Sequence, residues 1–433
     1  MSFLNDRITV IGLGYVGFPL AVEFAKKYLV IGYDNNKNRV KELYDGYDKT
    51  NSVDLSKQNN YIKTDFLDLE DSSSGLFMTD KLDFIKESNI YIVTVPTPIT
   101  KEFKPDLSFL FSACDIISKV LKVGDIVILE STVYPGCTEE DCVPILEKGS
   151  NLKYNKDFYC GYSPERINPG DVNNTLTNIK KVTSGSTPEI AIRVDYLYKS
   201  IIKAGTFLVS NIKIAEASKS IENAQRDVNI SFVNELAFIF DKMDIDTNEV
   251  LEAASTKWNF LPFRPGLVGG HCIGVDPYYL AYKSQQLGYT PDVILSGRNV
   301  NNNIPDLIFN KILRIVNKKE FSLFQSNVLI LGITFKENCS DIRNTKVVDI
   351  YDKFISVGAI VDVYDPYAIK EDVKREFNID LEDHYMNKQY SIIILAVGHD
   401  NFKDINFKKF KKLDSIIFDT RSFLPKDIVD GRL

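Results

Sequence analysis

The chain has little of several residue types on which whole classes of protein depend. It contains three histidines among 433 residues and six scattered cysteines without metal-ligand spacing, so we expect neither a metal site nor a disulfide framework. No apolar stretch approaches the ~20 residues of a membrane span, and the polar residues 1–7 lead us to expect no signal peptide. These absences predict a soluble cytoplasmic protein with reduced thiols and no membrane partner.

An excess of basic charge is also missing. The net charge is −7 and no basic face is visible, so a nucleic-acid partner is not expected. The one basic run, from 408 to 412, is interpreted as a solvated helix face. Cys114 and Cys160 stand in apolar or strand-like contexts and are expected to be buried. Only Cys272 has a setting that suggests a reactive thiol.

Short apolar runs rich in β-branched residues predict buried parallel strands that alternate with helices. In the first half of the chain we expect a helix over 19–27 and strands over 8–11, 29–33, 90–95 and 126–129. The polar residues 50–80 predict a loop or a short helical excursion. In the last third we expect strands over 328–333, 360–364, 392–397 and 416–418.

A long helix is predicted from about Asn211 to Lys242, because apolar residues recur there near the 3.6-residue period. It could be a plain core helix, or it could link two domains and supply a dimer interface. The predicted fold class is α/β, with two Rossmann-like domains joined by this central helix in a helical middle domain. The expected domains are 1–210, 211–320 and 321–433.

A dinucleotide fingerprint follows the first strand: Gly12-Leu13-Gly14-Tyr15-Val16-Gly17. It stands between a strand and a helix, where glycines let backbone amides approach a pyrophosphate. Asp34 ends the next strand, where a carboxylate can bond ribose hydroxyls and repel a 2′-phosphate, which favours NAD. Nearby Lys37 and Arg39 weaken that preference. The alternative is a glycine turn in a non-binding domain.

Two threonines stand after predicted strands, where ligands of open α/β sheets bind. Thr97 lies in Val95-Pro96-Thr97-Pro98 and could line the cofactor, although the prolines could simply end the strand. Thr132 follows Glu130-Ser131 and could touch the nicotinamide or a water, although capping of the strand end is an equal alternative.

Cys272 lies in the glycine-rich run Gly269-Gly270-His271-Cys272-Ile273-Gly274-Val275-Asp276-Pro277, so a substrate carbon can approach its sulfur. A free cysteine has a pKa of about 8.5, and a cation such as Lys219 would make the thiol a competent nucleophile. Asp276 could hold a water or a proton nearby. The alternative is a small loop residue without chemistry.

Other polar groups could assist such chemistry. Lys219 and Asn223 are four apart on the long helix, share a face and could stabilise an oxyanion, unless that face is simply solvated. Glu165 lies in the proline-pinned loop Ser163–Gly170 and could act as a general acid or base, unless this is a surface turn. Phe335-Lys336, Arg343 and Arg421 suggest a phosphorylated ligand of the second α/β domain, although each alone fits a surface charge.

These motifs occur in the order found in a known family. Over essentially its whole length the chain resembles the UDP-glucose/GDP-mannose 6-dehydrogenase family. The stretch from Trp258 to Leu280 resembles its UDP-N-acetylhexosamine branch, the Vi-antigen type included. The resemblance implies an N-terminal domain that binds NAD, a C-terminal domain that binds UDP, and a homodimer formed by the central helix.

The resemblance also implies roles for individual residues. Cys272 matches the cysteine that forms the thiohemiacetal and thioester, Lys219 and Asn223 match residues that hold the oxyanion and a water, and Asp276 matches the aspartate that orders this water. Glu165 matches the carboxylate of thioester hydrolysis, with Thr132 beside the catalytic water. The implied cofactor contacts include Arg39 and Arg343, and the substrate contacts include Arg166, Arg264, Gly269, Phe335, Lys336 and Arg421. Val275 and His271 depart from the UDP-glucose pattern and favour an N-acetylated sugar.

The implied activity is a four-electron oxidation of C6 of UDP-GlcNAc or UDP-GalNAc to the uronate, with two NAD reduced per sugar, for bacterial surface polysaccharide such as capsule or O-antigen. A UDP-glucose 6-dehydrogenase is an alternative within the family. A two-electron hydroxyacid dehydrogenase would need neither Cys272 nor a second α/β domain. A degenerate nucleotide sensor would be expected to lack at least one of these polar residues.

Overall fold

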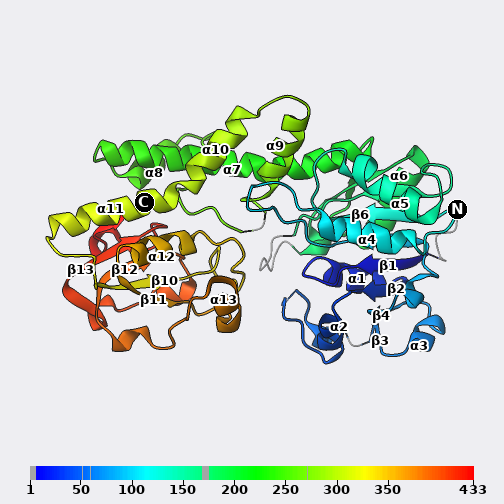
Figure 1. Ribbon diagram of the computed structural model, residues 1–433, viewed down its shortest axis with the longest axis horizontal. Helices are drawn as coiled ribbons and strands as arrows, with labels where there is room; N and C mark the ends of the chain where they lie inside the picture. Colours follow the sequence, from blue (N-terminus) through cyan, green and yellow to red (C-terminus); the bar gives the residue numbers. More distant parts are fainter. Residues whose placement is uncertain (1–5, 51, 59, 168–174, 271) are drawn as a thin grey trace. The chain divides into compact units, whose positions relative to one another are not determined.

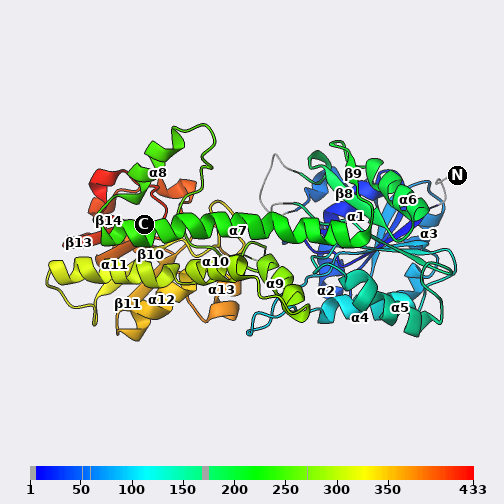
Figure 2. The same cartoon turned by 90° about the horizontal axis from the view of Figure 1, so that it is seen from above.

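A computed structural model describes residues 6–50, 52–58, 60–167, 175–270 and 272–433 (Figure 1). The chain divides into two compact units, which are described one at a time. The first comprises Met1–Glu222 and Tyr278–Gly288, and the second comprises Asn223–Pro277 and Tyr289–Leu433. The long helix α7 (Ile212–Lys242), green in Figure 2, is continuous through the point at which the division crosses the chain.

The first unit is built on one nine-stranded sheet with the order β3-β4-β2-β1-β5-β6-β7-β8-β9. Its neighbouring strands are parallel except for β7 and β8, which run antiparallel. The strands are β1 (Arg7–Ile11), β2 (Leu29–Tyr33), β3 (Ile62–Lys63), β4 (Gly75–Thr79), β5 (Ile90–Val93), β6 (Ile126–Leu129), β7 (Tyr159–Tyr162), β8 (Lys181–Gly185) and β9 (Thr206–Leu208).

Helices cover both faces of this sheet. Every residue of β5 and β6 is buried as a result, although neighbouring side chains of a strand point to opposite faces. Helices α1 and α6 share one apolar cluster with alternate residues of β5 and β6, while α4 contacts β5 and packs on α5. The helices are α1 (Gly17–Ala25), α2 (Lys37–Tyr44), α3 (Phe66–Glu70), α4 (Ser108–Ser118), α5 (Val143–Ser150) and α6 (Pro188–Lys199).

The strand order of this sheet reverses at β1. The chain passes from β1 to β2 on one side, and later returns to place β5 on the other side. Crevices form at the carboxyl ends of strands where such a reversal occurs, and ligands of open α/β sheets bind there. The loops after β1, β5 and β6 therefore stand where a cofactor is expected.

The central helices connect this sheet to a second one. They are α7, α8 (Thr247–Ser255), α9 (Asp276–Gln286), α10 (Asp292–Asn302) and α11 (Ile304–Lys318). The apolar residues that predicted α7 lie in part on its exposed side: Ile221 is 54% and Phe232 is 56% exposed. Its buried side carries smaller residues such as Ala224 and Ala237. The helix therefore exposes part of its large apolar side chains, while its buried side mixes small apolar with polar residues.

The second unit contains a five-stranded parallel sheet in the order β11-β10-β12-β13-β14. Helices α11 and α12 contribute to its main apolar core, and α11 contacts β13. The elements are β10 (Asn327–Leu331), α12 (Val347–Ser356), β11 (Ile360–Tyr364), α13 (Lys370–Phe377), β12 (Tyr390–Leu395), β13 (Lys411–Asp419) and β14 (Gly431–Arg432).

The predicted fold class is confirmed, but three local predictions are wrong. Residues 50–80 contain β3, α3 and the fully buried β4, because the apolar run Leu76-Phe77-Met78 is concealed among serines and aspartates. The basic run at 408–412 is no helix face, since a 3₁₀ turn (Phe407–Lys409) leads there into β13. Helix α1 begins at Gly17 rather than Pro19.

Two further expectations concern thiols and membranes. Cys114 and Cys160 are fully buried, as predicted, whereas Cys272 is half-buried. Over the ranges that the structure describes, no helix is both long enough and apolar enough to cross a bilayer.

Candidate active site

The glycine loop after β1 is tied to the end of β2 by two backbone donors. Gly12 takes a φ of +94° and donates its N–H to the Tyr33 carbonyl at 2.8 Å, and Leu13 donates its N–H to Asp34 Oδ2 at 2.9 Å. Asp34 is half-buried, so lone pairs of its carboxylate remain for ribose hydroxyls. Within the described chain no side chain caps the N-terminus of α1. This cradle fits the pyrophosphate and ribose of NAD.

Two glycines of the loop have opposite surroundings. A Cβ on Gly17 would lie 1.9 Å from the Gly12 carbonyl oxygen, whereas a Cβ on Gly14 would meet no atom within 4 Å. We expect Gly14→Ala to fold normally, since a compatible Gly→Ala change stabilises by about 0.4–1 kcal/mol, yet to weaken NAD binding about ten-fold or more by obstructing the pyrophosphate. We expect Gly17→Ala to lower the melting temperature instead. Calorimetric NAD titration and thermal unfolding of both variants test this contrast; equal NAD affinity of Gly14→Ala and wild type would contradict it.

Arg39 lies under the loop rather than on its surface. Its side chain is 4% exposed, its Nε donates to the Leu13 carbonyl at 2.8 Å, and its guanidinium pairs with Glu42 and, at 2.7 Å, with Asp48. The guanidinium also lies 5.8 Å from the centre of the Phe18 ring. Arg39 thus supports the cofactor loop from below. A direct contact between Arg39 and the cofactor stays a prediction.

The aspartate of the second sheet that corresponds to Asp34 is buried and fully hydrogen-bonded. Asp365 follows β11 as Asp34 follows β2, but its side chain is fully buried and accepts hydrogen bonds from the N–H groups of Ile333, Thr334, Tyr367 and Ala368. The buried His399 lies 3.0 Å from Asp365 Oδ2 through Nε2, and its Nδ1 accepts the Asn338 N–H. Burial alone would raise the pKa of Asp365, but the His399 pair and the backbone hydrogen bonds outweigh it and hold this pKa below its usual range. Asp365 therefore has no lone pair left for a ribose.

The polar residues after β5, β6 and β7 belong to the first unit. Thr97 is half-buried and its carbonyl accepts the Tyr279 hydroxyl at 2.8 Å, while Thr132 is half-buried directly after Ser131. Glu165 is 8% exposed; its Oε1 accepts the N–H of Ile167. Arg166 pairs with Glu222 at 2.8 Å. Residues 168–170 of the predicted proline loop lie outside the described residues.

A buried carboxylate that the sequence did not single out is Glu216, one turn before Lys219 on α7. Glu216 is fully buried, and its carboxylate accepts the Gly136 N–H at 2.6 Å, the Thr138 N–H at 2.9 Å and the Thr138 hydroxyl at 2.6 Å. It thereby fastens the start of α7 to the turn that follows Thr132. Burial raises the pKa of Glu216 to about 7, although these hydrogen bonds oppose the shift.

This raised pKa predicts a pH-dependent stability. A carboxyl whose pKa is higher in the folded state stabilises fully below its unfolded value, near 4.5, and this contribution is lost as the pH rises through about 7. We expect wild type to lose about 3 kcal/mol relative to Glu216→Gln between pH 4.5 and pH 8, at 1.36 kcal/mol per pKa unit. Urea unfolding at both pH values measures this, with Glu222→Gln on the same helix as control. A difference that does not change with pH would contradict the prediction.

The predicted nucleophile lies in the second unit, just before α9. The Cys272 carbonyl accepts the N–H of Val275 at 3.0 Å and of Asp276 at 2.8 Å, which begins the helix at Asp276. Asn223 donates its Nδ2 to Asp276 Oδ2 at 2.6 Å, and both side chains are buried. The backbone of Cys272 and the side chains of Asp276 and Asn223 are therefore linked by hydrogen bonds within two short segments. His271 lies outside the described residues.

The loop before Cys272 packs on the second sheet. The Gly270 N–H donates to the Asn344 carbonyl at 3.3 Å and the Asn344 side chain donates back to the Gly270 carbonyl at 3.0 Å. At Gly270 the φ is +81° and a Cβ would lie 2.8 Å from the Phe335 ring. This close packing fixes the position of the loop that carries Cys272.

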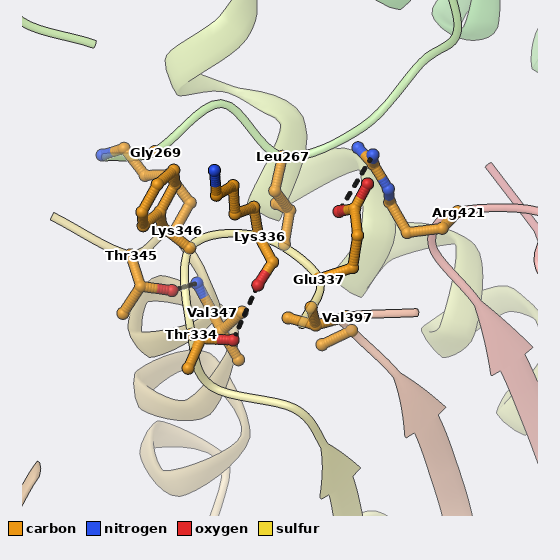
Figure 3. A pocket seen from close by; sticks show the side chains of 12 residues that line it. Leu267, Gly269, Thr334, Lys336, Glu337, Thr345, Lys346, Val347, Val397 and Arg421 are labelled. Carbon is orange, nitrogen blue, oxygen red and sulfur yellow. Dashed lines mark hydrogen bonds and ion pairs between the residues drawn. The ribbon is translucent and has the colours of Figure 1, made fainter. Parts of the chain in front are cut away.

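A pocket opens beside this loop, at the carboxyl ends of β10 and β12 (Figure 3). Three cations line it, Lys336, Lys346 and Arg421, against one acid, Glu337, which lies 3.7 Å from Arg421. Gly269 and Phe335 line it as well. An excess of positive charge with a planar guanidinium suits a phosphorylated ligand.

Some predicted ligand contacts lie apart from this pocket lining. Arg343 is exposed and pairs with Asp341 at 2.6 Å, and Arg264 is exposed on the segment before Gly266. Lys219 is 7% exposed and belongs, with Thr132 and Glu165, to the first unit. Cys272, Asn223 and Asp276 belong to the second unit. Hydrogen bonds thus join Cys272, Asn223 and Asp276 in the second unit, and the grouping of Lys219, Thr132 and Glu165 with them stays a prediction.

Comparisons with known proteins bear on the whole chain. Three models of the UDP-glucose/GDP-mannose dehydrogenase family match it: the NAD binding domain over residues 6–202, the central domain over 213–303 and the UDP binding domain over 329–426. The chain therefore belongs to this family and is an NAD-dependent dehydrogenase. The predicted family and the predicted cofactor NAD are confirmed.

Individual relatives are similar over their full length. The chain is 51% identical over 430 residues to UDP-N-acetyl-D-glucosamine 6-dehydrogenase of Pseudomonas aeruginosa, with 99% of each chain covered. It is 50% identical over 433 residues to the protein of that name from Salmonella typhi, covering 99% of this chain and 98% of the relative. The solved structure of UDP-D-ManNAc dehydrogenase from Pyrococcus horikoshii superposes with a TM-score of 0.86 at 29% identity, with 98% of each chain covered.

Proposed function

We propose that this chain oxidises C6 of a UDP-N-acetylhexosamine to the uronate, with UDP-N-acetylglucosamine as the preferred substrate, and reduces two NAD per sugar. The observation that carries the proposal is the arrangement of Cys272, Asp276 and Asn223 beside a cation-lined pocket in a chain of this family. The relatives at 51% and 50% identity are both UDP-N-acetyl-D-glucosamine 6-dehydrogenases, which supports the choice of sugar.

In the proposed mechanism, Lys336 and Arg421 bind the diphosphate of the substrate, with Gly269 and Phe335 lining its site. NAD, held at Gly12–Gly17 and Asp34, supplies the hydride acceptor. Lys219 and Asn223 stabilise the oxyanion at C6 and hold a water, which accepts the proton of the alcohol as the hydride leaves C6. Cys272 then adds to the aldehyde through its sulfur to give a thiohemiacetal, so that no free aldehyde leaves the site.

The second oxidation leaves the uronyl group as a thioester on Cys272. Asp276 orients the Asn223 amide, to which it is bonded at 2.6 Å, and orders a water. Glu165 accepts a proton from the hydrolytic water, with Thr132 beside it. Arg39, Thr97 and Arg343 complete the proposed cofactor contacts, and Arg166 and Arg264 the substrate contacts.

The test is the number of NADH formed per sugar consumed, measured with UDP-GlcNAc, UDP-GalNAc and UDP-glucose in parallel. Two NADH per sugar, fastest with UDP-GlcNAc, is the expected result. One NADH per sugar would overturn the thioester mechanism and leave a two-electron dehydrogenase. Two NADH with UDP-glucose as the fastest substrate would overturn the assigned sugar alone.

The chain is further proposed to act as a cytoplasmic homodimer with the domains 1–210, 211–320 and 321–433. Support for a dimer comes from the apolar residues exposed on and after α7, among them Phe232 at 56% and Met243 at 58%. Surface polysaccharide synthesis is the proposed pathway; a relative 47% identical over 427 residues is Protein CapL of Staphylococcus aureus. Light scattering of wild type and Phe232→Asp tests the dimer, which the variant should dissociate.

A further inference from the structure

A lysine and two glutamates are buried together at one edge of the first sheet. Glu130 directly follows β6 and is fully buried, Lys181 opens β8 and is 3% exposed, and Glu165 lies three residues beyond β7. Because β8 runs antiparallel to β7, its first residue lies at the edge where the parallel strands end. Lys181 therefore reaches the edge of the sheet at which ligands bind.

The contacts show one ammonium shared by two acids. Lys181 Nζ lies 2.5 Å from Glu130 Oε2 and 3.8 Å from Glu165 Oε2. Tyr198 of α6 donates its hydroxyl to Glu130 Oε1, and its ring centre lies 5.3 Å from Lys181 Nζ. Both oxygens of Glu130 are thus engaged. Glu165 Oε2, in contrast, is buried and accepts no hydrogen bond within the described residues.

The charges of the cluster do not balance. If both acids ionise, two negative charges face one ammonium in a region that excludes water. Burial raises the pKa of Glu130, repulsion from Glu165 adds to the shift, and Lys181 opposes it. Such a group of charges is weak support for stability, since apolar residues of similar volume would serve the fold as well or better. The cluster therefore calls for a role in the chemistry of Glu165.

We propose that Lys181 is a positioning residue of the hydrolysis step: it holds the Glu165 carboxylate ionised and oriented, while Glu130 and Tyr198 hold Lys181. This inference rests on the proposed function. As water adds to the thioester carbon, a C–O bond forms and one proton of the water passes to Glu165. That proton then goes to the Cys272 sulfur as the C–S bond breaks. The other proton leaves with the acid product, which ionises in solvent.

The proposal predicts opposite pH effects for the two partners of Glu165. Removing the ammonium disfavours the ionised carboxylate, so Lys181→Met should move the acid limb of kcat to higher pH. Glu130→Gln removes a negative charge beside Glu165 and so favours the ionised Glu165 carboxylate. This variant should therefore move the acid limb of kcat to lower pH. Of the other charged groups nearby, Arg166 is paired with Glu222 and with the Lys180 carbonyl. If Lys181 had only a structural role, the two variants would not shift the acid limb in opposite directions.

The experiment is stopped-flow detection of NADH with the full-length enzyme, UDP-N-acetylglucosamine and NAD. We expect Lys181→Met to form two NADH per active site in a burst at the wild-type rate. Its steady-state rate should then fall about 10²-fold, the lower end for loss of general-base assistance. Mass spectrometry should find the uronyl adduct on Cys272. Thr183→Val on the same strand is the control, because Thr183 is equally buried but donates its hydroxyl to Asp195 at 2.7 Å.

Each outcome decides between roles. Equal shifts of the acid limb in Lys181→Met and Thr183→Val, shifts of the same sign in Lys181→Met and Glu130→Gln, or loss of the burst in Lys181→Met would overturn the proposal. If Lys181→Met fails to fold, the shift of Glu130→Gln to lower pH still tests it. A wild-type enzyme that forms one NADH per sugar would instead remove the proposed function itself.

Discussion

Cys272→Ala is expected to lower uronate formation by about 10⁴-fold or more, the scale on which loss of a nucleophile acts. In the proposed mechanism no thioester forms without the sulfur, so the second oxidation has no bound substrate. The first oxidation needs only the cofactor and the groups that accept the alcohol proton. The variant should therefore yield at most one NADH per sugar, together with aldehyde that an amine reagent can trap.

The fold should tolerate this change. Cys272 is half-buried and its backbone carbonyl, rather than its thiol, accepts the two hydrogen bonds that begin α9. We therefore expect Cys272→Ala and Cys272→Ser to melt within a few degrees of wild type, which thermal unfolding measures. Two NADH per sugar from Cys272→Ala would contradict the assigned nucleophile.

Asp276→Ala is expected to lower kcat by about 10²–10³-fold, the size of effect that loss of one preorganised polar group has in other active sites. The carboxylate is 2% exposed and accepts the Asn223 amide at 2.6 Å. Without it the amide loses the partner that orients its oxygen and its second N–H. Steady-state kinetics at saturating substrate measure the loss.

A double-mutant cycle separates this pair from independent roles. Asn223→Ala and Asp276→Ala remove the two ends of one buried hydrogen bond, so the double variant should be less impaired than the product of the single losses. The expected coupling is about 1–3 kcal/mol, as for bonded groups that act as a unit. Independent effects of the two changes would contradict the view that Asp276 works through Asn223.

The sequence predicts the fold well where the apolar pattern is continuous over a whole strand or helix. Strand 360–364 is reproduced residue for residue as β11, and α7 begins one residue after the predicted start. Strand β4 was not predicted because its apolar centre is only three residues long and its sequence neighbours are polar. The exposure of apolar residues on α7 was not predictable, because periodicity shows that a helix has an apolar side but not what covers that side.

The site divides in the same way. Motif residues such as Gly14, Asp34 and Cys272 are visible because glycine spacing and loop context mark them. Glu216, Lys181 and His399 have no distinctive local sequence context: the partners that give each its role lie 16 to 80 positions away in the chain. Burial of a charged residue is a property of the fold, so no sequence pattern announces it.

The sealed carboxylate of Asp365 has a consequence for how the two substrates compete. Two sheets of similar topology in one chain would ordinarily provide two binding sites for the same nucleotide. The His399 imidazole and four backbone N–H groups occupy the acid that a dinucleotide would need in the second sheet. NAD therefore lacks a free ribose-binding carboxylate in the UDP binding domain, and we expect that a high NAD concentration does not inhibit binding of the sugar nucleotide there.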